Sequence, residues 1–154
     1  MFDRLKAWIE DDKAGAPAGG QDDLAMAVAA LLIETGRVDH TLGDTERQLI
    51  GRLLERRFGL APDQARALEQ AAERRAERSA QLFGFARTIN ERMPREWRAG
   101  LVEMLWEVAY ADGVLDPLED SLLRRIGGLI DVSDRERGEA KLRVLARLGI
   151  REEE

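Results

Sequence analysis

The residues of this chain best suited to chemistry are five carboxylates placed beside two predicted turns. They are Asp112, Asp116 and Glu119 at the second turn, and Asp39 and Glu46 at the first. Carboxylate oxygens are the ligands that hard divalent cations prefer, and a calcium site needs about six to eight oxygens. Neither turn supplies that many, so a site requires the two turns to meet. A divalent metal ion, whose identity the sequence leaves open, is therefore the candidate cofactor.

The second turn reads as the end of one helix followed closely by the start of another. Gly113 suits the end of the first helix, because glycine adopts a left-handed backbone without a Cβ clash. Pro117 suits the first position of the next helix, where no N–H is needed. Asp116 and Glu119 have the spacing of N-cap and N3 in a capping box. Helix capping, worth about 1 kcal/mol, and bonding of Asp112 to local amides explain the same acids, so both interpretations stay open.

An earlier stretch of the chain repeats this turn at an offset of 73 residues. The offset places Asp112 on Asp39, Leu115 on Leu42 and Glu119 on Glu46. We interpret the match as an internal duplication of a helix–acidic turn–helix unit. The first copy is the weaker site, because Gly43 stands where the second copy has an aspartate and His40 stands where it has a glycine. His40 could ligate a transition metal or simply be solvated.

The second turn can also be compared with a calcium-binding EF-hand loop. If Gly113 is taken as the invariant glycine of that loop, the three acids of this turn fall on ligand positions. Val108 and Tyr110 then stand where the first two carboxylates belong. The turn is therefore not an ordinary EF-hand.

Other catalytic signals are missing from the sequence. There is no cysteine, no nucleophile elbow, no glycine-rich phosphate loop and no paired-histidine zinc motif. An enzyme that uses clustered carboxylates in a bundle remains a third reading, but the Glu-x-x-His pairs of di-iron bundles are absent. We therefore expect a non-enzymatic protein with no catalytic residue and no organic cofactor.

Composition limits the partners of the chain. The net charge of −6 disfavours nucleic acid and anionic membranes. The longest apolar run, Leu24–Ile33, is too short to cross a bilayer, which needs about 20 residues. No signal peptide is visible at the N-terminus. We expect a cytoplasmic protein with protein partners and without stable membrane insertion, and a homodimer stays open.

The elements that position the acids are all helical, since apolar residues recur with helical spacing and no strand-like alternation occurs. We predict an all-α, compact bundle of about seven to eight helices with a pseudo-twofold repeat. Residues 1–12 form an amphipathic helix, which could dock on the body or lie in a membrane interface. Residues 13–20 form a linker, and residues 21–150 form the helical domain. Its predicted helices are 22–37, 44–58, 62–78, 79–92, 94–111, 117–130 and 133–149.

The segment Met104–Glu119, with its Ala-Asp-Gly turn followed by a glutamate, resembles the TerB-like tellurite-resistance family, in particular its branch of uncharacterised bacterial proteins. Ile33–Asp39, Phe58–Pro62 and the start of the last helix at Val132-Ser133 also fit, so the resemblance covers about residues 21–148. It implies a compact helical fold with pseudo-twofold repeats, a link to tellurite or general stress response, and metal association without an enzymatic reaction. The family name records a phenotype, so tellurite is not taken as a substrate. The acidic positions that carry over are Asp112, Asp116, Glu119, Asp39 and Glu46.

These observations leave two leading functions. The first is a stress-response binding or scaffold domain that takes a divalent metal at the paired acidic turns. The second is a metal-independent protein-interaction module, in which the turns only cap helices and an apolar patch is exposed. Trp8, Trp97 and Trp106 are the candidates for that patch.

Overall fold

Helices supply all the regular secondary structure of the residues that this computed structural model describes, which are 20–37, 42–76 and 82–151. Seven α-helices and one 3-10 turn occur in these residues. They are α2 (Gly20–Arg37), α3 (Asp44–Phe58), α4 (Pro62–Ala76), α5 (Leu82–Arg92), the turn η1 (Arg95–Trp97), α6 (Arg98–Ala109), α7 (Pro117–Leu129) and α8 (Asp134–Leu148). The all-α class and the number of helices are thus confirmed.

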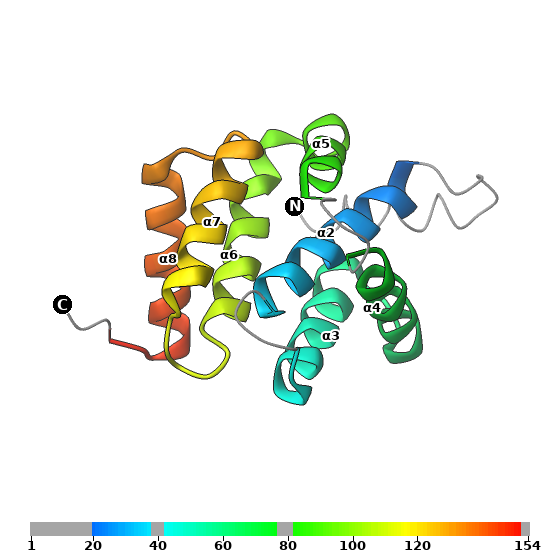
Figure 1. Ribbon diagram of the computed structural model, residues 1–154, viewed down its shortest axis with the longest axis horizontal. Helices are drawn as coiled ribbons and strands as arrows, with labels where there is room; N and C mark the ends of the chain where they lie inside the picture. Colours follow the sequence, from blue (N-terminus) through cyan, green and yellow to red (C-terminus); the bar gives the residue numbers. More distant parts are fainter. Residues whose placement is uncertain (1–19, 38–41, 77–81, 152–154) are drawn as a thin grey trace.

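Helix α2 runs through the middle of the molecule (Figure 1) and packs against α3, α4, α5, α6 and α7. Its apolar run, Leu24–Ile33, is almost entirely buried. A helix that is apolar on all sides is stable only when other elements surround it. The long run of apolar residues therefore marks the central helix of the fold.

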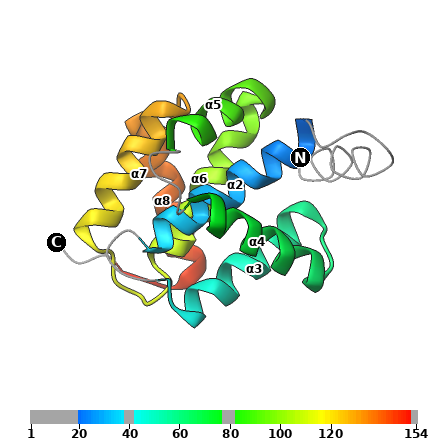
Figure 2. The same cartoon turned by 45° about the vertical axis from the view of Figure 1, so that its right-hand side comes forward.

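Two groups of helices pack around α2. Helices α6, α7 and α8 lie side by side in both views, and α3 and α4 form a hairpin on another side (Figures 1 and 2). Trp106 of α6 is fully buried, and its Nε1 donates to the carbonyl of Arg137 on α8 at 3.1 Å. The turn that joins α6 to α7 reaches the start of α3 at the edge between the two groups.

Several apolar residues lie differently from the sequence prediction. Trp97 and Trp106 are buried, so neither can belong to an exposed patch. The helical spacing of the apolar residues predicts that Leu118, Leu142 and Leu148 face the core, yet all three are exposed. The stripe predictions were wrong at these positions because each helix is covered on a narrower face than its apolar residues occupy.

The sixth helix also begins later than predicted. Pro94 has φ −54° and ψ 141°, so it precedes the helix instead of occupying its first position. The 3-10 turn η1 follows, and α6 itself runs only from Arg98 to Ala109.

The predicted helix 1–12 and most of the linker 13–20 lie outside the described residues, although Gly20 already belongs to α2. The domain boundaries at 21 and 150 stay predictions. None of the described helices is both long and apolar enough to cross a membrane.

Candidate functional site

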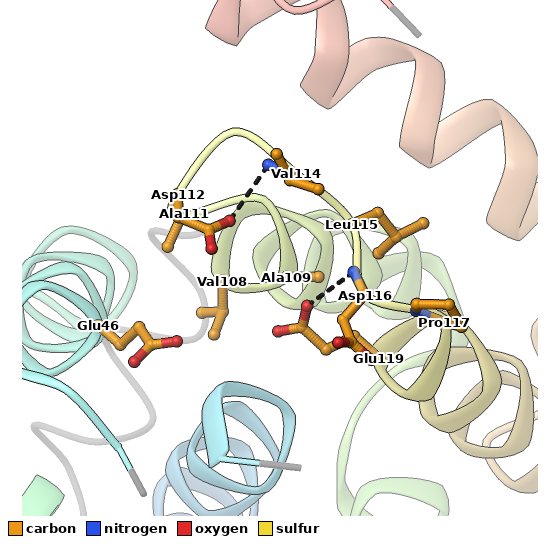
Figure 3. A pocket seen from close by; sticks show the side chains of 10 residues that line it. All are labelled: Glu46, Val108, Ala109, Ala111, Asp112, Val114, Leu115, Asp116, Pro117 and Glu119. Atoms are coloured by element: carbon orange, nitrogen blue, oxygen red, sulfur yellow. Dashed lines mark hydrogen bonds between the residues drawn. The ribbon is translucent and has the colours of Figure 1, made fainter. Parts of the chain in front are cut away.

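A pocket of about 200 Å³ lies where the α6–α7 turn meets the first turn of α3 (Figure 3). Four of the residues that line it are acidic, and none is a lysine or an arginine. The acids are Glu46, Asp112, Asp116 and Glu119. The apolar wall comes from α6 and the turn, with Val108, Ala109, Ala111, Val114, Leu115 and Pro117.

The turn itself has the geometry that the sequence predicts. Gly113 has φ +87°, the left-handed conformation that ends the helical segment. Its N–H donates to the carbonyl of Tyr110 at 2.9 Å. One oxygen of Asp112 accepts from the N–H of Val114 at 3.1 Å, so this acid does bond a local amide.

The start of α7 forms the predicted capping box. Asp116 accepts from the N–H of Leu118 at 2.7 Å, and Glu119 accepts from the N–H of Asp116 at 3.2 Å. These bonds satisfy amides that the first helical turn leaves without partners. Glu119 is 5% exposed, so its carboxylate is held inside the pocket wall.

Glu46 brings the first turn's helix to the same pocket. It occupies the N3 position of α3 and accepts from the N–H of Gly43 at 2.8 Å, as Glu119 does at the N3 position of α7. Its side chain extends towards Val108 and the α6–α7 turn (Figure 3). The two glutamates thus share one local geometry, while duplication of the whole unit stays a prediction. Asp39 and His40 lie outside the described residues.

The pocket supplies the right donor type for a hard cation but not a finished cage. Within the described part of the chain, no group of three or more His, Cys, Asp or Glu side chains is placed closely enough to hold a metal ion. A cation here would therefore keep part of its water shell, as Mg²⁺ commonly does. The residues fit a hydrated divalent ion better than a fully dehydrated one.

The comparison with protein families matches the model described as tellurite resistance protein TerB over residues 25–142, which is more than half of the chain. The chain belongs to the TerB family. Neither the curated proteins nor the solved structures give a match to this TerB domain.

Three further glutamates of the TerB domain, on α2 and α6, form ion pairs with arginine. Glu34 pairs with Arg37 at 2.6 Å, and Glu103 and Glu107 both pair with Arg147, at 2.7 and 2.8 Å. None of the three lines the acidic pocket. The last two cross-link α6 to α8, so their role is explained by packing.

A buried carboxyl on α4 was missed from the sequence. Glu69 is 8% exposed, and its Oε2 has no hydrogen-bond partner among the residues that the structure describes. Polar and charged residues recur along α4, which is typical of a solvated helix face. The signal that could have found it is spacing: Ala65, Glu69, Ala72 and Ala76 fall on one buried stripe of α4.

Proposed function

We propose that this TerB domain is a non-enzymatic binding or scaffold module of a tellurite-resistance-like stress response, and that it takes a hydrated divalent cation in the acidic pocket. The observation that carries the proposal is the lining of that pocket. Four acidic residues, Glu46 from the start of α3 and three from the α6–α7 turn and the start of α7, line this pocket, and no lysine or arginine lines it. Such a cluster produces a negative potential that a divalent cation relieves.

The capping bonds of these acids are compatible with a cation. A carboxylate offers about four acceptor positions, so one side chain can accept an amide and still contact a metal. The capping bonds also hold the carboxylates in place before the cation arrives, which reduces the ordering cost of binding. A bound cation would join α3, through Glu46, to the α6–α7 turn.

The test is the thermal stability of the protein in Ca²⁺, Mn²⁺ or Zn²⁺ after chelator treatment. A ligand that binds only the folded state raises its stability, so we expect a higher Tm with at least one of these ions. Asp112→Asn combined with Glu119→Gln keeps the side-chain shapes and should abolish the rise.

Glu136→Gln is the matched control for Glu119→Gln. Glu136 is the N3 residue of the α8 capping box, where it accepts from the N–H of Ser133 at 2.9 Å, and it does not line the pocket. The control should keep the full cation response. Calorimetry that detects no heat with any of the three ions would remove the metal proposal.

A metal-independent interaction module is the second candidate. It is favoured by the capping bonds, which give each acid a structural role, and by two exposed apolar side chains at the turn and the start of α7. Val114 is 69% exposed and Leu118 is 54% exposed. A protein partner that stays bound in chelator, and is lost with Val114→Ser and Leu118→Ser, would support this candidate over the first. Light scattering of the free protein would show whether that partner is a second copy of the chain.

A further inference from the structure

A second pocket, of about 490 Å³, runs between one face of α3 and one face of α4. Its lining is polar and carries charges of both signs. From α3 come Asp44, Arg47, Gln48, Gly51, Arg52 and Glu55, and from α4 come Pro62, Ala65, Arg66, Glu69 and Gln70. We call it the α3–α4 groove. Its size is in the range of small-molecule sites, about 300–1,000 Å³.

Glu69 is the buried member of this lining. More than nine-tenths of it is covered, and its Oε2 finds no hydrogen-bond donor among the described residues. The obvious donor, Arg47, is already used: its two terminal nitrogens reach the two oxygens of Glu73 at 2.7 and 2.8 Å. An acceptor buried without a partner carries a desolvation cost that a donor would remove.

Helix α3 leaves room in the groove at the position that lies opposite Glu69. Helices α3 and α4 are joined by a short loop and pack as an antiparallel pair, whose register the Arg47–Glu73 ion pair fixes. One turn nearer the loop, Gly51 and Glu69 take corresponding positions. A Cβ built on Gly51 would meet no atom within 4 Å. The missing side chain therefore leaves room on the α3 side of the groove, at the level of Glu69.

We propose that the α3–α4 groove binds a small organic cation, a primary ammonium on a short alkyl chain, whose nitrogen donates to Glu69 and whose chain lies over Gly51. Asp44 and Glu55 add negative charge to the same groove. Arg52 and Arg66 also line it, but both are exposed and hydrated. An anion that bound them would leave Glu69 without a donor, so the cation relieves the larger cost.

The protonation of Glu69 gives this binding a pH dependence. Burial raises the pKa of Glu69 to about 7, and the charges that act on it are Arg47 from α3 and Glu73 and Arg66 from α4. On α2, which also packs against α4, Glu34 and Arg37 pair with each other. An ammonium binds the ionised carboxylate, and the ionised fraction rises about tenfold from pH 6 to pH 8 for such a pKa.

The experiment is a titration of the full chain with n-butylamine at both pH values, followed by calorimetry or by NMR shifts of α3 and α4. We expect saturable binding that is about tenfold tighter at pH 8. Glu69→Gln should weaken it at least tenfold, and Gly51→Leu should block it by filling the space. Gly128→Leu is the matched control, because a Cβ at Gly128 on α7 also meets no atom within 4 Å.

A variant of the acidic pocket and a neutral ligand show whether the amine binds at Glu69 or elsewhere. Asp112→Asn with Glu119→Gln alters only the acidic pocket, so it should leave amine binding unchanged whether or not a metal binds there. No saturable binding of n-butylamine, equal binding by Glu69→Gln, or equally tight binding of n-butanol would each overturn the proposal. Circular dichroism of each variant separates loss of binding from loss of fold.

Discussion

The buried carboxyl of Glu69 should make this protein less stable as the pH rises through neutrality. In the folded state its burial raises the pKa to about 7, while an unfolded glutamate has the reference value of 4.5. Between these values the folded state therefore binds more protons than the unfolded state. Stability then falls as the pH increases, because it falls wherever the folded state holds the extra proton. The loss of stability caused by Glu69 is small below pH 4.5, the pKa of the unfolded state, and reaches its full size above about pH 7, the pKa of the folded state.

The size of the effect follows from the two pKa values. For a single group with these values, linkage gives a loss of about 1.4 kcal/mol in the free energy of unfolding between pH 6 and pH 8. Over the whole range the limit is about 3.4 kcal/mol. Glu69→Gln keeps the shape of the side chain and cannot ionise, so this variant should lack that part of the pH dependence. It should also be more stable than the parent at pH 8.

Urea denaturation of the parent and of Glu69→Gln, measured from pH 6 to pH 8, tests this reasoning. The quantity to follow is the difference between the two proteins at each pH, because all other titrating groups cancel in it. The difference should grow with pH in favour of the glutamine variant. A flat difference, or one that grows in favour of the parent, would show that Glu69 is ionised and compensated throughout, and would refute the argument from burial.

Three further substitutions test the packing of the helices, and urea denaturation measures the stability of each variant. Gly51→Ala should stabilise the protein by about 0.5–1 kcal/mol, because it removes a helical glycine and meets open space. The same change at Gly36 should give no such gain and should cost stability, because its Cβ would lie 2.7 Å from a methyl of the buried Leu42. Arg98→Met should cost roughly 2 kcal/mol, because the Arg98 guanidinium donates to the carbonyls of Ile130 at 3.0 Å and Met93 at 3.2 Å. If Arg98→Met leaves the free energy of unfolding almost unchanged, the desolvation cost of burying the guanidinium must equal the stabilisation from these hydrogen bonds.

The sequence predicted best what neighbouring residues decide. The glycine at the α6–α7 turn and the capping box of Asp116 and Glu119 involve residues a few positions apart, and their geometry follows from backbone chemistry. The central position of α2 followed from its continuous apolar run.

The sequence could not predict which face of each outer helix is covered by its neighbours in the fold. Leu142 and Leu148 have helical spacing but stay exposed, because no described helix packs over that side of α8. Glu69 shows the opposite case: a glutamate on a polar, charged helix is expected to be solvated, yet it is buried in the fold. Convergence of Glu46 with the second turn was a hypothesis for the same reason, since it depends on how α3 packs against α6.

The two capping boxes at α7 and α8 indicate why capping alone is an incomplete account of the acidic pocket. Both place a glutamate at N3, and both glutamates accept the N–H of their own N-cap residue. At α8, Glu136 does this while exposed to solvent, so the capping role needs no burial. At α7, Glu119 is 5% exposed and shares a pocket with three other acids and no lysine or arginine. Burial of the glutamate and its place in an acidic pocket are therefore features that the capping role alone does not explain. The proposed cation would give this glutamate a second role beside its cap, and departures of this kind from local rules are typical of functional sites.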